Sequence, residues 1–158
     1  MIRPYEPRDA DALWALKRAF ETGLGESGST EKAAAYDAKL TDRYRERWLA
    51  WVDRCVADES CLFVATAEDG LDGYCFLLPE RLAFIWDAAV LNELYVRPEC
   101  RGTGLADDLL ERALVHAREQ DLPLDRLVLD VDRDNERART FYERHDFSHW
   151  GEMVAREL

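Results

Sequence analysis

The sequence predicts an α/β fold in which helices cover both faces of one mixed sheet. Two apolar segments in the middle of the chain, residues 61–67 and 74–78, flank a stretch rich in glycine and aspartate, and this pattern predicts a β-hairpin. In the second half of the chain, strand-like segments alternate with amphipathic helical patterns. The chain has 158 residues, which is the length of one ordinary domain, so a single domain over residues 1–158 is expected.

The first part of the chain is predicted to be mostly helical. A short strand at residues 2–5 precedes a helix whose apolar residues recur at spacings of three and four. Residues 22–30 hold three glycines and two serines, so a loop is expected there. An amphipathic pattern over residues 31–57 then predicts one long helix that covers the sheet.

The second half of the chain supplies the remaining strands and helices. Aliphatic runs predict the strands, and a 3.6-residue apolar period predicts the helices. In order, we expect a strand at 84–96, a helix at 103–119, a strand at 127–131, a short helix capped by Asp134 or Asn135, and a last strand at 150–156.

The chain is strongly acidic. It has 21 lysines and arginines against 33 aspartates and glutamates, which gives a formal net charge of −12. This balance argues against a nucleic-acid partner, because phosphates select basic surfaces. It is compatible with a cationic small molecule or a basic peptide as partner, and also with an acidic surface that only keeps the protein soluble.

Neither a membrane segment nor a metal site is predicted. The sequence has no apolar run of about eighteen residues and no charged-then-apolar leader at Met1, so a cytoplasmic protein is expected. The four cysteines show no C-x-x-C spacing, and we interpret them as reduced packing residues. The sequence is compatible with a homodimer as well as with a monomer.

A glycine-containing turn precedes the helix at residues 103–119. The turn, Arg101-Gly102-Thr103-Gly104, places two glycines and an arginine directly before a helix N-terminus. Glycine lets the main chain approach a ligand closely, and the unpaired amides and the dipole at a helix N-terminus attract phosphate. The turn therefore predicts a phosphate-binding site.

Two common nucleotide motifs are excluded at this turn. A dinucleotide fingerprint needs a third glycine, and Asp107 stands at that position. A P-loop needs a lysine followed by serine or threonine after its last glycine, and Leu105 and Ala106 stand there. The phosphate must belong to another kind of ligand.

Two blocks of the sequence resemble the GNAT superfamily of N-acetyltransferases. The segment Arg101-Gly102-Thr103-Gly104-Leu105-Ala106 is similar to that family's acetyl-coenzyme A signature, R/Q-x-x-G-x-G/A, and the segment Leu94-Tyr95-Val96-Arg97-Pro98 before it is similar to the family's fourth strand. The second block is similar to the pattern N-x-x-A-x-x-F-Y…G-F and consists of Asn135, Ala138, Phe141, Tyr142 and Phe147. Asp146 replaces the usual glycine, and because aspartate tolerates a left-handed backbone, we expect the turn to survive.

The resemblance implies a mainly antiparallel sheet whose fourth and fifth strands splay apart around acetyl-coenzyme A, the co-substrate, with no metal. Asp107 and Asp108 are expected to point away from the diphosphate, which they would repel. The residues expected to bind the coenzyme are Leu94, Tyr95, Val96, Arg101, Gly102, Thr103, Gly104, Leu105, Ala106, Asn135 and Ala138.

Tyr142 takes the general-acid position of the family by the same resemblance. A leaving thiolate has an ordinary pKa near ~8.5 and tyrosine one near ~10, so a tyrosine hydroxyl can protonate the thiolate at neutral pH. We therefore expect Tyr142 to be catalytic.

The sequence does not identify the general base. Family members with a direct base carry Glu or His at the positions held here by Val90 and Asn92, and neither of these side chains takes a proton at neutral pH. Asn92 could orient a water that relays the proton, or Glu93 could act directly if a β-bulge turned it inward. A more distant carboxylate such as Asp87 is the third alternative.

The leading hypothesis is an N-acetyltransferase that moves the acetyl group of acetyl-coenzyme A directly to a primary amine of a small, cationic molecule in a ternary complex. The alternatives are a transferase for a protein N-terminus or lysine, and a non-catalytic module that binds acyl-coenzyme A. The acceptor walls are expected from residues 20–50, the hairpin and residues 81–87, where Tyr44, Trp48 and Trp86 would suit a cation.

Overall fold

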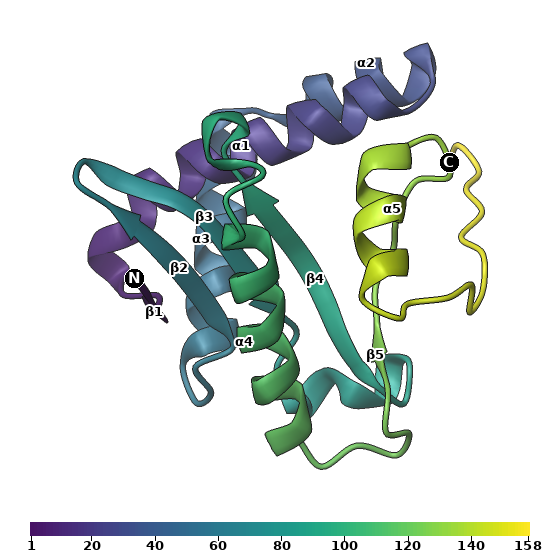
Figure 1. Cartoon of the computed structure of the whole chain (residues 1–158). Coiled ribbons are helices and arrows are strands. Elements are labelled where there is room, and N and C mark those ends of the chain that lie inside the picture. The colour runs from purple at the N-terminus through teal and green to yellow at the C-terminus, as the bar shows by residue number, and fades with distance from the viewer.

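The structure, a computed structural model, describes residues 1–158 apart from the side chains of residues 25–27. Its strands form one five-stranded sheet in the order β1-β2-β3-β4-β5 (Figure 1). The strands are β1 (Ile2–Pro4), β2 (Leu62–Ala67), β3 (Gly70–Leu77), β4 (Ala89–Val96) and β5 (Leu127–Val128). Neighbouring strands are antiparallel except β4 and β5, which are parallel. The predicted mixed and mainly antiparallel sheet is confirmed, and β2 and β3 form the predicted hairpin.

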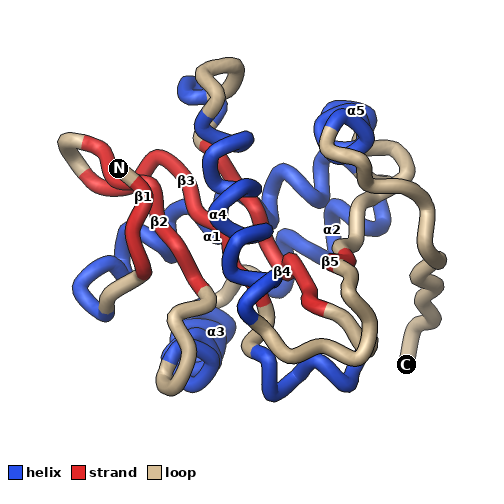
Figure 2. The backbone as a smooth tube through the Cα atoms, turned by 60° about the horizontal axis from the view of Figure 1, so that its bottom comes forward, coloured by secondary structure: helices blue, strands red, loops and turns tan.

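Helices cover both faces of the sheet, as predicted (Figures 1 and 2). They are α1 (Ala10–Ser27), α2 (Thr30–Lys39), α3 (Asp42–Val56), α4 (Leu105–Glu119) and α5 (Glu136–Arg144). On one face Phe63 of β2 packs against α4, where its ring lies 5.5 Å from that of His116. On the other face, shared by α1 and α3, Trp51 of α3 lies 5.2 Å from Phe76 of β3. The hydrophobic core therefore has two layers, one on each side of the sheet.

A β-bulge interrupts β4 in its middle. Phe76 of β3 lies opposite Glu93, but the next residue, Leu77, lies opposite Leu91. Asn92 is therefore an extra residue without a cross-strand partner. A bulge re-aims the side chains that follow it, and this one turns Glu93 toward α1.

The parallel strands β4 and β5 stay together over only two residue pairs. Ala89 lies opposite Leu127 and Val90 opposite Val128, and no further pair between them is formed in the described chain. Beyond this point the two strands diverge, with α5 following β5 away from the sheet (Figure 1). The splay predicted for the fourth and fifth strands is present, and it leaves one edge of β4 open.

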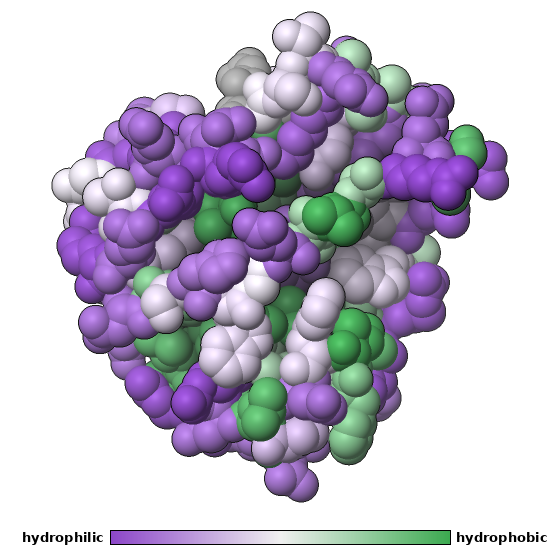
Figure 3. Space-filling view, turned by 90° about the vertical axis from the view of Figure 1, so that its right-hand side faces the viewer, coloured by the Kyte–Doolittle hydropathy of each residue, from purple (hydrophilic) through white to green (hydrophobic). Residues whose placement is uncertain are grey.

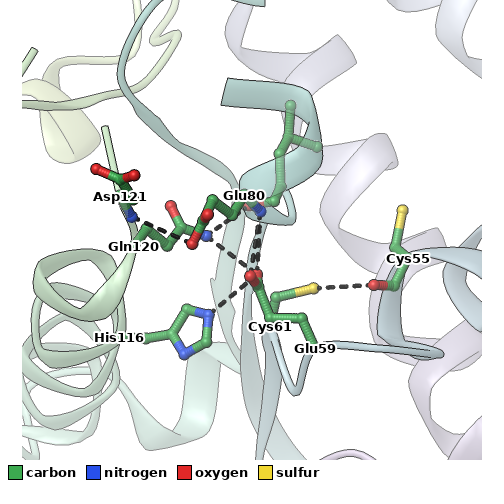
Figure 4. A network of polar contacts seen from close by, with 8 residues as sticks. Cys55, Glu59, Cys61, Glu80, His116, Gln120 and Asp121 are labelled. Atoms are coloured by element: carbon green, nitrogen blue, oxygen red, sulfur yellow. Dashed lines mark hydrogen bonds and ion pairs between the residues drawn. The ribbon is translucent and has the colours of Figure 1, made fainter. Parts of the chain in front are cut away.

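A half-buried polar cluster holds the C-terminal end of α4 against the hairpin. The carboxylate of Glu59 lies 3.2 Å from Nε2 of His116 and accepts a hydrogen bond from Nε2 of Gln120 at 3.0 Å (Figure 4). Gln120 also donates to the carbonyl oxygen of Leu78 at 3.2 Å. These contacts join α4 to the segments at the start of β2 and the end of β3. This end of the sheet is remote from the glycine turn.

The predicted helix at 31–57 is wrong as a single element, because α2 ends at Lys39 and α3 begins at Asp42. Thr41 is the N-cap of α3, and its hydroxyl accepts a hydrogen bond from the amide of Tyr44 at 3.2 Å. Such a cap starts a new helix inside a continuous amphipathic pattern. The predicted loop at 22–30 is helical at residues 22–24, and residues 25–27 lie outside the fully described part of the chain.

Two predicted strands differ at the other end of the chain. Residues 150–156 form no strand but an extended coil beside α5, with Trp150 and Val154 exposed (Figure 1). β5 covers two residues, whereas a strand at 127–131 was expected. The strand expected at 84–96 begins at Ala89, because a 3₁₀ helix, η2 (Glu80–Ile85), and the left-handed Asp87 (φ 57°) precede it.

No helix in the described part of the structure is long and apolar enough to cross a membrane.

Candidate functional site

A large cleft of about 1430 Å³ lies between β4 and α5. Residues of β4, of the segment after β5 and of α1 line it. Figure 3, which faces the side of the molecule that carries α5, shows apolar atoms recessed between hydrophilic side chains. The cleft brings together residues from both predicted motifs and from β4, namely Asn92, Glu93, Leu94, Tyr95, Val96, Arg101, Gly102, Gly104, Ala106, Asn135, Ala138 and Tyr142.

The glycine turn lies at one end of the cleft with its main chain exposed to it. Gly102 has φ 75° and Gly104 has φ 88°, a left-handed conformation that favours glycine. A Cβ atom built on either residue would meet no atom within 4 Å, so open space adjoins both. Gly104 is the N-cap of α4, whose first amides have no partner within the helix. The turn therefore presents free amide groups and the positive end of a helix dipole to the cleft.

Two predicted coenzyme-binding residues have other contacts. The hydroxyl of Thr103 donates a hydrogen bond to the carbonyl oxygen of Cys100 at 2.6 Å, which holds the turn together. Leu105 packs against the hydrophobic core. Their side chains do not line the cleft, so only their main-chain groups are placed to meet a ligand.

Arginines from two elements converge beside the turn. Nε of Arg101 donates to the carbonyl oxygen of Val96 at 3.3 Å, and the guanidinium lies 5.9 Å from the ring of Tyr95. Arg137, in the first turn of α5, also lines the cleft. Burial and the charge of Arg101 lower the pKa of Arg137. Two positive groups that repel each other in one cleft form a site that an anion would stabilise.

The charge of the cleft differs from that of the chain as a whole. Among the described residues, five arginines and four carboxylates line it, although the chain carries a formal charge of −12. A phosphate-bearing ligand would be repelled by most of the surface and attracted to this cleft. The arginine of the second motif, Arg137, was missed in the sequence although it stands between the recognised Asn135 and Ala138.

An ion pair joins α4 to the C-terminal end of α5 beside the cleft. Asp107 of α4 accepts a hydrogen bond from the guanidinium of Arg144 on α5 at 2.9 Å, and the same oxygen lies 2.6 Å from Nε2 of His145. Hydrogen bonds from Arg144 and His145 lower the pKa of Asp107. The carboxylate is thus engaged with α5.

Residues of the second sequence block lie at both ends of α5. Asn135 is its N-cap, and Oδ1 accepts a hydrogen bond from the amide of Ala138 at 3.2 Å. At the other end, Asp146 has φ 67° and the amide of Phe147 donates to the carbonyl oxygen of Tyr142 at 3.0 Å. The expectation that the turn survives with aspartate in place of glycine is confirmed.

Tyr142 lines the cleft from α5. Its ring lies 5.2 Å from that of Phe141 and 5.5 Å from that of Phe147, and these contacts fix its position. Burial raises the pKa of Tyr142, whereas the charge of Arg137 acts in the opposite direction. The hydroxyl is therefore protonated at neutral pH, with a positive group near enough to favour loss of the proton.

Glu93 lines the cleft from the bulge in β4 but is only 5% exposed. Oε2 accepts a hydrogen bond from the hydroxyl of Tyr74 at 2.8 Å, and Oε1 is paired with Nζ of Lys17 on α1. Burial raises the pKa of Glu93, and Lys17 and Tyr74 oppose this effect. Asn92, next to it, is exposed in the same cleft.

Lys17 and Tyr74, whose side chains engage the two carboxylate oxygens of Glu93, were not recognised in the sequence. Lys17 follows Leu16 on the buried side of α1, and a lysine at such a position signals a buried partner. The partner, Glu93, is 76 positions away in the chain, so its identity depends on the fold.

The expected acceptor walls are wrong in part. Residues of α1 and the segment after β5 line the cleft, whereas the hairpin loop and residues 81–87 do not. Trp86 is 58% exposed on the surface, and Trp48 packs beside Lys17 with its ring 5.1 Å from Nζ. The aromatic and acidic surroundings expected for a cation are occupied by a lysine of the protein itself.

The family follows from a comparison with known proteins. Residues 14–147 match the family model described as the acetyltransferase (GNAT) family. The chain belongs to the GNAT family. The resemblance to this family found in its sequence is confirmed.

Among relatives of this GNAT protein, a mycothiol acetyltransferase of Streptomyces griseus is 31% identical over 151 residues, which cover 93% of this chain and 42% of the relative. The chain spans about half the length of the curated relatives it matches. The solved structure of a ribosomal-protein-alanine N-acetyltransferase from Brucella melitensis has a TM-score of 0.73 and 22% identity, and covers 96% of this chain and 86% of that chain. PaiA N-acetyltransferase from Thermoplasma acidophilum, in complex with coenzyme A, has a TM-score of 0.70 and 21% identity, with coverages of 92% and 87%.

Within the described residues there is no group of three or more His, Cys, Asp or Glu side chains that could hold a metal ion.

Proposed function

We propose that this GNAT protein transfers the acetyl group of acetyl-coenzyme A to a primary amine of a small molecule, directly and in a ternary complex. The observation that carries the proposal is the cleft of about 1430 Å³, which connects the glycine turn, Tyr142 and the bulge at Asn92. Pockets for one small ligand usually measure about 300–1000 Å³. The cleft therefore has room for a donor and an acceptor side by side.

The coenzyme fits the residues at one end of the cleft. Amide groups of residues 102–106 hold the diphosphate, and Arg101 and Arg137 neutralise it. The amide of Arg101 already donates to the carbonyl oxygen of Pro98 at 3.2 Å. The open edge of β4 at Leu94, Tyr95 and Val96 offers main-chain groups to the pantetheine arm. The N-terminus of α5 at Asn135 and Ala138 lies along the opposite wall.

Acetyl-coenzyme A supplies a thioester whose carbonyl carbon is attacked by the amine and whose sulfur leaves as a thiol. Tyr142 donates the proton that the sulfur takes up as the carbon–sulfur bond breaks. Its hydroxyl is protonated at neutral pH, and the nearby Arg137 stabilises the tyrosinate that the transfer leaves behind.

The residues at the β-bulge, Asn92 and Glu93, take up the proton of the amine. Both carboxylate oxygens of Glu93 are already engaged, by Lys17 and Tyr74, and only a small part of the side chain is exposed. An acceptor would therefore reach Glu93 through a water molecule held by the exposed amide of Asn92. Asp87 does not line the cleft and is not used.

An ion pair favours a small acceptor over a polypeptide. Nζ of Lys32 on α2 is paired with Oδ2 of Asp132, which follows β5 and lines the cleft. The pair joins the two elements between which a peptide chain would have to lie. Asp130 lies beside the same lysine, so two carboxylates against one ammonium favour an acceptor that carries positive charge.

The test is an assay with acetyl-coenzyme A and a panel of small amines, in which release of free thiol and formation of the acetylated amine are both measured. The proposal predicts thiol release that depends on an amine and matches the acetylated product. Thiol release without product, or acetylation of peptides but of no small amine, would reject it.

A further inference from the structure

Lys17 is the most deeply buried cation in the described part of the structure, with 3% of its surface exposed. Nζ is paired with Oε1 of Glu21 on the same helix and with Oε1 of Glu93 on β4, and it lies 5.1 Å from the ring of Trp48. A buried ammonium is costly unless it is paired and hydrogen-bonded. An apolar residue at this position would pack against the sheet without the desolvation cost of a charge. The presence of a lysine is therefore not explained by packing alone.

The reason lies in Glu93, whose side chain pairs with no positive group other than Lys17 among the residues that the structure describes. The extra residue in β4, Asn92, turns Glu93 inward beneath α1. There the hydroxyl of Tyr74 holds Oε2 at 2.8 Å, and the ammonium of Lys17 holds Oε1. Two fixed donors leave the carboxylate one orientation, beside the cleft wall.

The other charged and titratable groups around Glu93 come from four elements. Glu21 lies between Lys17 and Lys39, and Nζ of Lys39 on α2 is 2.7 Å from Oε2 of Glu21. The groups that face this cluster are Lys17 and Glu21 from α1, Lys39 from α2, Tyr44 from α3 and Tyr74 from β3. Two carboxylates face two ammonium groups, so the cluster is neutral as a whole. Removal of Lys17 leaves the cluster with a net negative charge, whereas removal of Glu21 leaves it with a net positive charge.

We propose that Lys17 is a positioning residue that keeps Glu93 ionised and correctly oriented to receive the proton of the acceptor amine. This inference rests on the proposed function. As the nitrogen–carbon bond forms, the amine loses a proton to the water at Asn92, and that water passes a proton to Glu93. As the carbon–sulfur bond breaks, the sulfur takes a proton from Tyr142. Glu93 then returns its proton to solvent and Tyr142 takes one up, so the protons balance.

The directions of the pKa shifts agree with this role. Burial raises the pKa of Glu93, and Lys17 lowers it. Burial alone would lower the pKa of Lys17, but Glu93 and Glu21 raise it above its ordinary value, so Lys17 stays charged over the working range of pH. Without Lys17, Glu93 would be a buried carboxyl that takes a proton at higher pH and could no longer accept one from the acceptor.

The test measures the Glu93 carboxyl directly by ¹³C NMR as a function of pH, with its signal assigned by its loss in Glu93→Gln. We expect the titration of Glu93 to move to higher pH in Lys17→Met, to stay near that of the parent in Lys17→Arg, and to move to lower pH in Glu21→Gln. In the same series kcat at pH 7 should fall at least about tenfold in Lys17→Met if the pKa of Glu93 rises to about one unit above the assay pH, and it should recover as the pH rises.

A matched control is Arg3→Met, which removes the ion pair of Arg3 with Asp9, 2.8 Å long and outside the cleft. It should lower thermal stability without moving the titration of Glu93. If Lys17→Met only lowered stability, or if Glu21→Gln shifted the titration upward, the role of Lys17 would be structural and the inference wrong. If Lys17→Met did not fold, Glu21→Gln and Lys17→Arg would decide alone. Full activity of Glu93→Gln would instead reject the proton route, and absence of acetylated product in the parent would reject the proposed function.

Discussion

Oδ1 of Asp107, in the first turn of the helix after the glycine turn, lies 2.6 Å from Nε2 of His145, at the end of the helix that carries Tyr142. The contact joins the proposed phosphate site to the proposed general acid across the cleft. Arg144 adds a second hydrogen bond to the same carboxylate. The position of Tyr142 relative to the glycine turn therefore depends on Asp107.

Replacing Asp107 with alanine should lower kcat. Release of α5 would let Tyr142 move, and a misplacement of about 1 Å at a reacting group can cost about 10²-fold in rate. Steady-state kinetics with a saturating acceptor measure the change. Glu111→Ala is the control, because Glu111 lies on the exposed side of α4 and pairs with the exposed Arg118 at 3.7 Å. Equal kcat values in both variants would show that the contact does not position Tyr142.

The same ion pair predicts a dependence of stability on pH. Arg144 and His145 lower the pKa of Asp107, so the carboxylate binds a proton more readily in the unfolded chain. Its contribution is complete above the ordinary aspartate pKa of about 3.9 and is lost as the pH falls through the lower folded value. The melting temperature of Asp107→Asn should therefore lie below that of the parent at pH 7, and the difference should shrink in acid. A constant difference down to pH 3 would contradict this sign.

Gly104→Ala should weaken coenzyme binding more than it weakens the fold. The φ of 88° costs alanine about 1–2 kcal/mol. Apart from the adjoining residues of the chain, no atom lies within 4 Å of the new Cβ, so the methyl group would project into the space that we assign to the diphosphate. Thermal denaturation and calorimetric titration with coenzyme A separate the two effects. An unchanged Kd would mean that the diphosphate binds elsewhere.

Tyr142→Phe should reduce kcat by about 10²–10⁴-fold, the usual contribution of a general acid. The ring contacts with Phe141 and Phe147 stay in place, so the affinity for coenzyme A and the melting temperature should not change. Kinetics and calorimetry on the same preparation provide the comparison. A variant with normal kcat would remove Tyr142 from the mechanism.

Lys32→Ala should widen the range of acceptors. Loss of the ion pair with Asp132 opens the space between α2 and the segment after β5, so bulky amines should gain in kcat/KM relative to small ones. The panel of amines used for the parent gives the comparison. Glu143→Ala is the control, because its pair with Arg139, at 3.8 Å, lies on the exposed surface of α5. An unchanged order of acceptors in Lys32→Ala would show that this pair does not limit their size.

The glycine turn and both ends of α5 could be predicted from the sequence because their signals are local. Gly102 and Gly104 lie beside the helix start that they serve, and Asn135 caps the helix that begins one residue later. Asp146 could be predicted to keep a left-handed turn because its own backbone preference decides it.

Glu93 and Lys17 could not be paired from the sequence, because their contact depends on packing between distant segments. Strict alternation along β4 gives Glu93 the wrong face, and only the register with β3 reveals the extra residue at Asn92. The strand expected at residues 150–156 failed for a related reason: alternating apolar residues favour a strand, but a strand forms only where another one pairs with it.

The central claim is that the glycine turn holds the coenzyme so that its sulfur lies beside Tyr142, and a crystal structure of the protein with coenzyme A tests it most directly. We predict the diphosphate on the amides of residues 102–106 and the sulfur within hydrogen-bond distance of the Tyr142 hydroxyl. A diphosphate bound away from Gly102 and Gly104, or a sulfur at the far side of the cleft from Tyr142, would contradict the account.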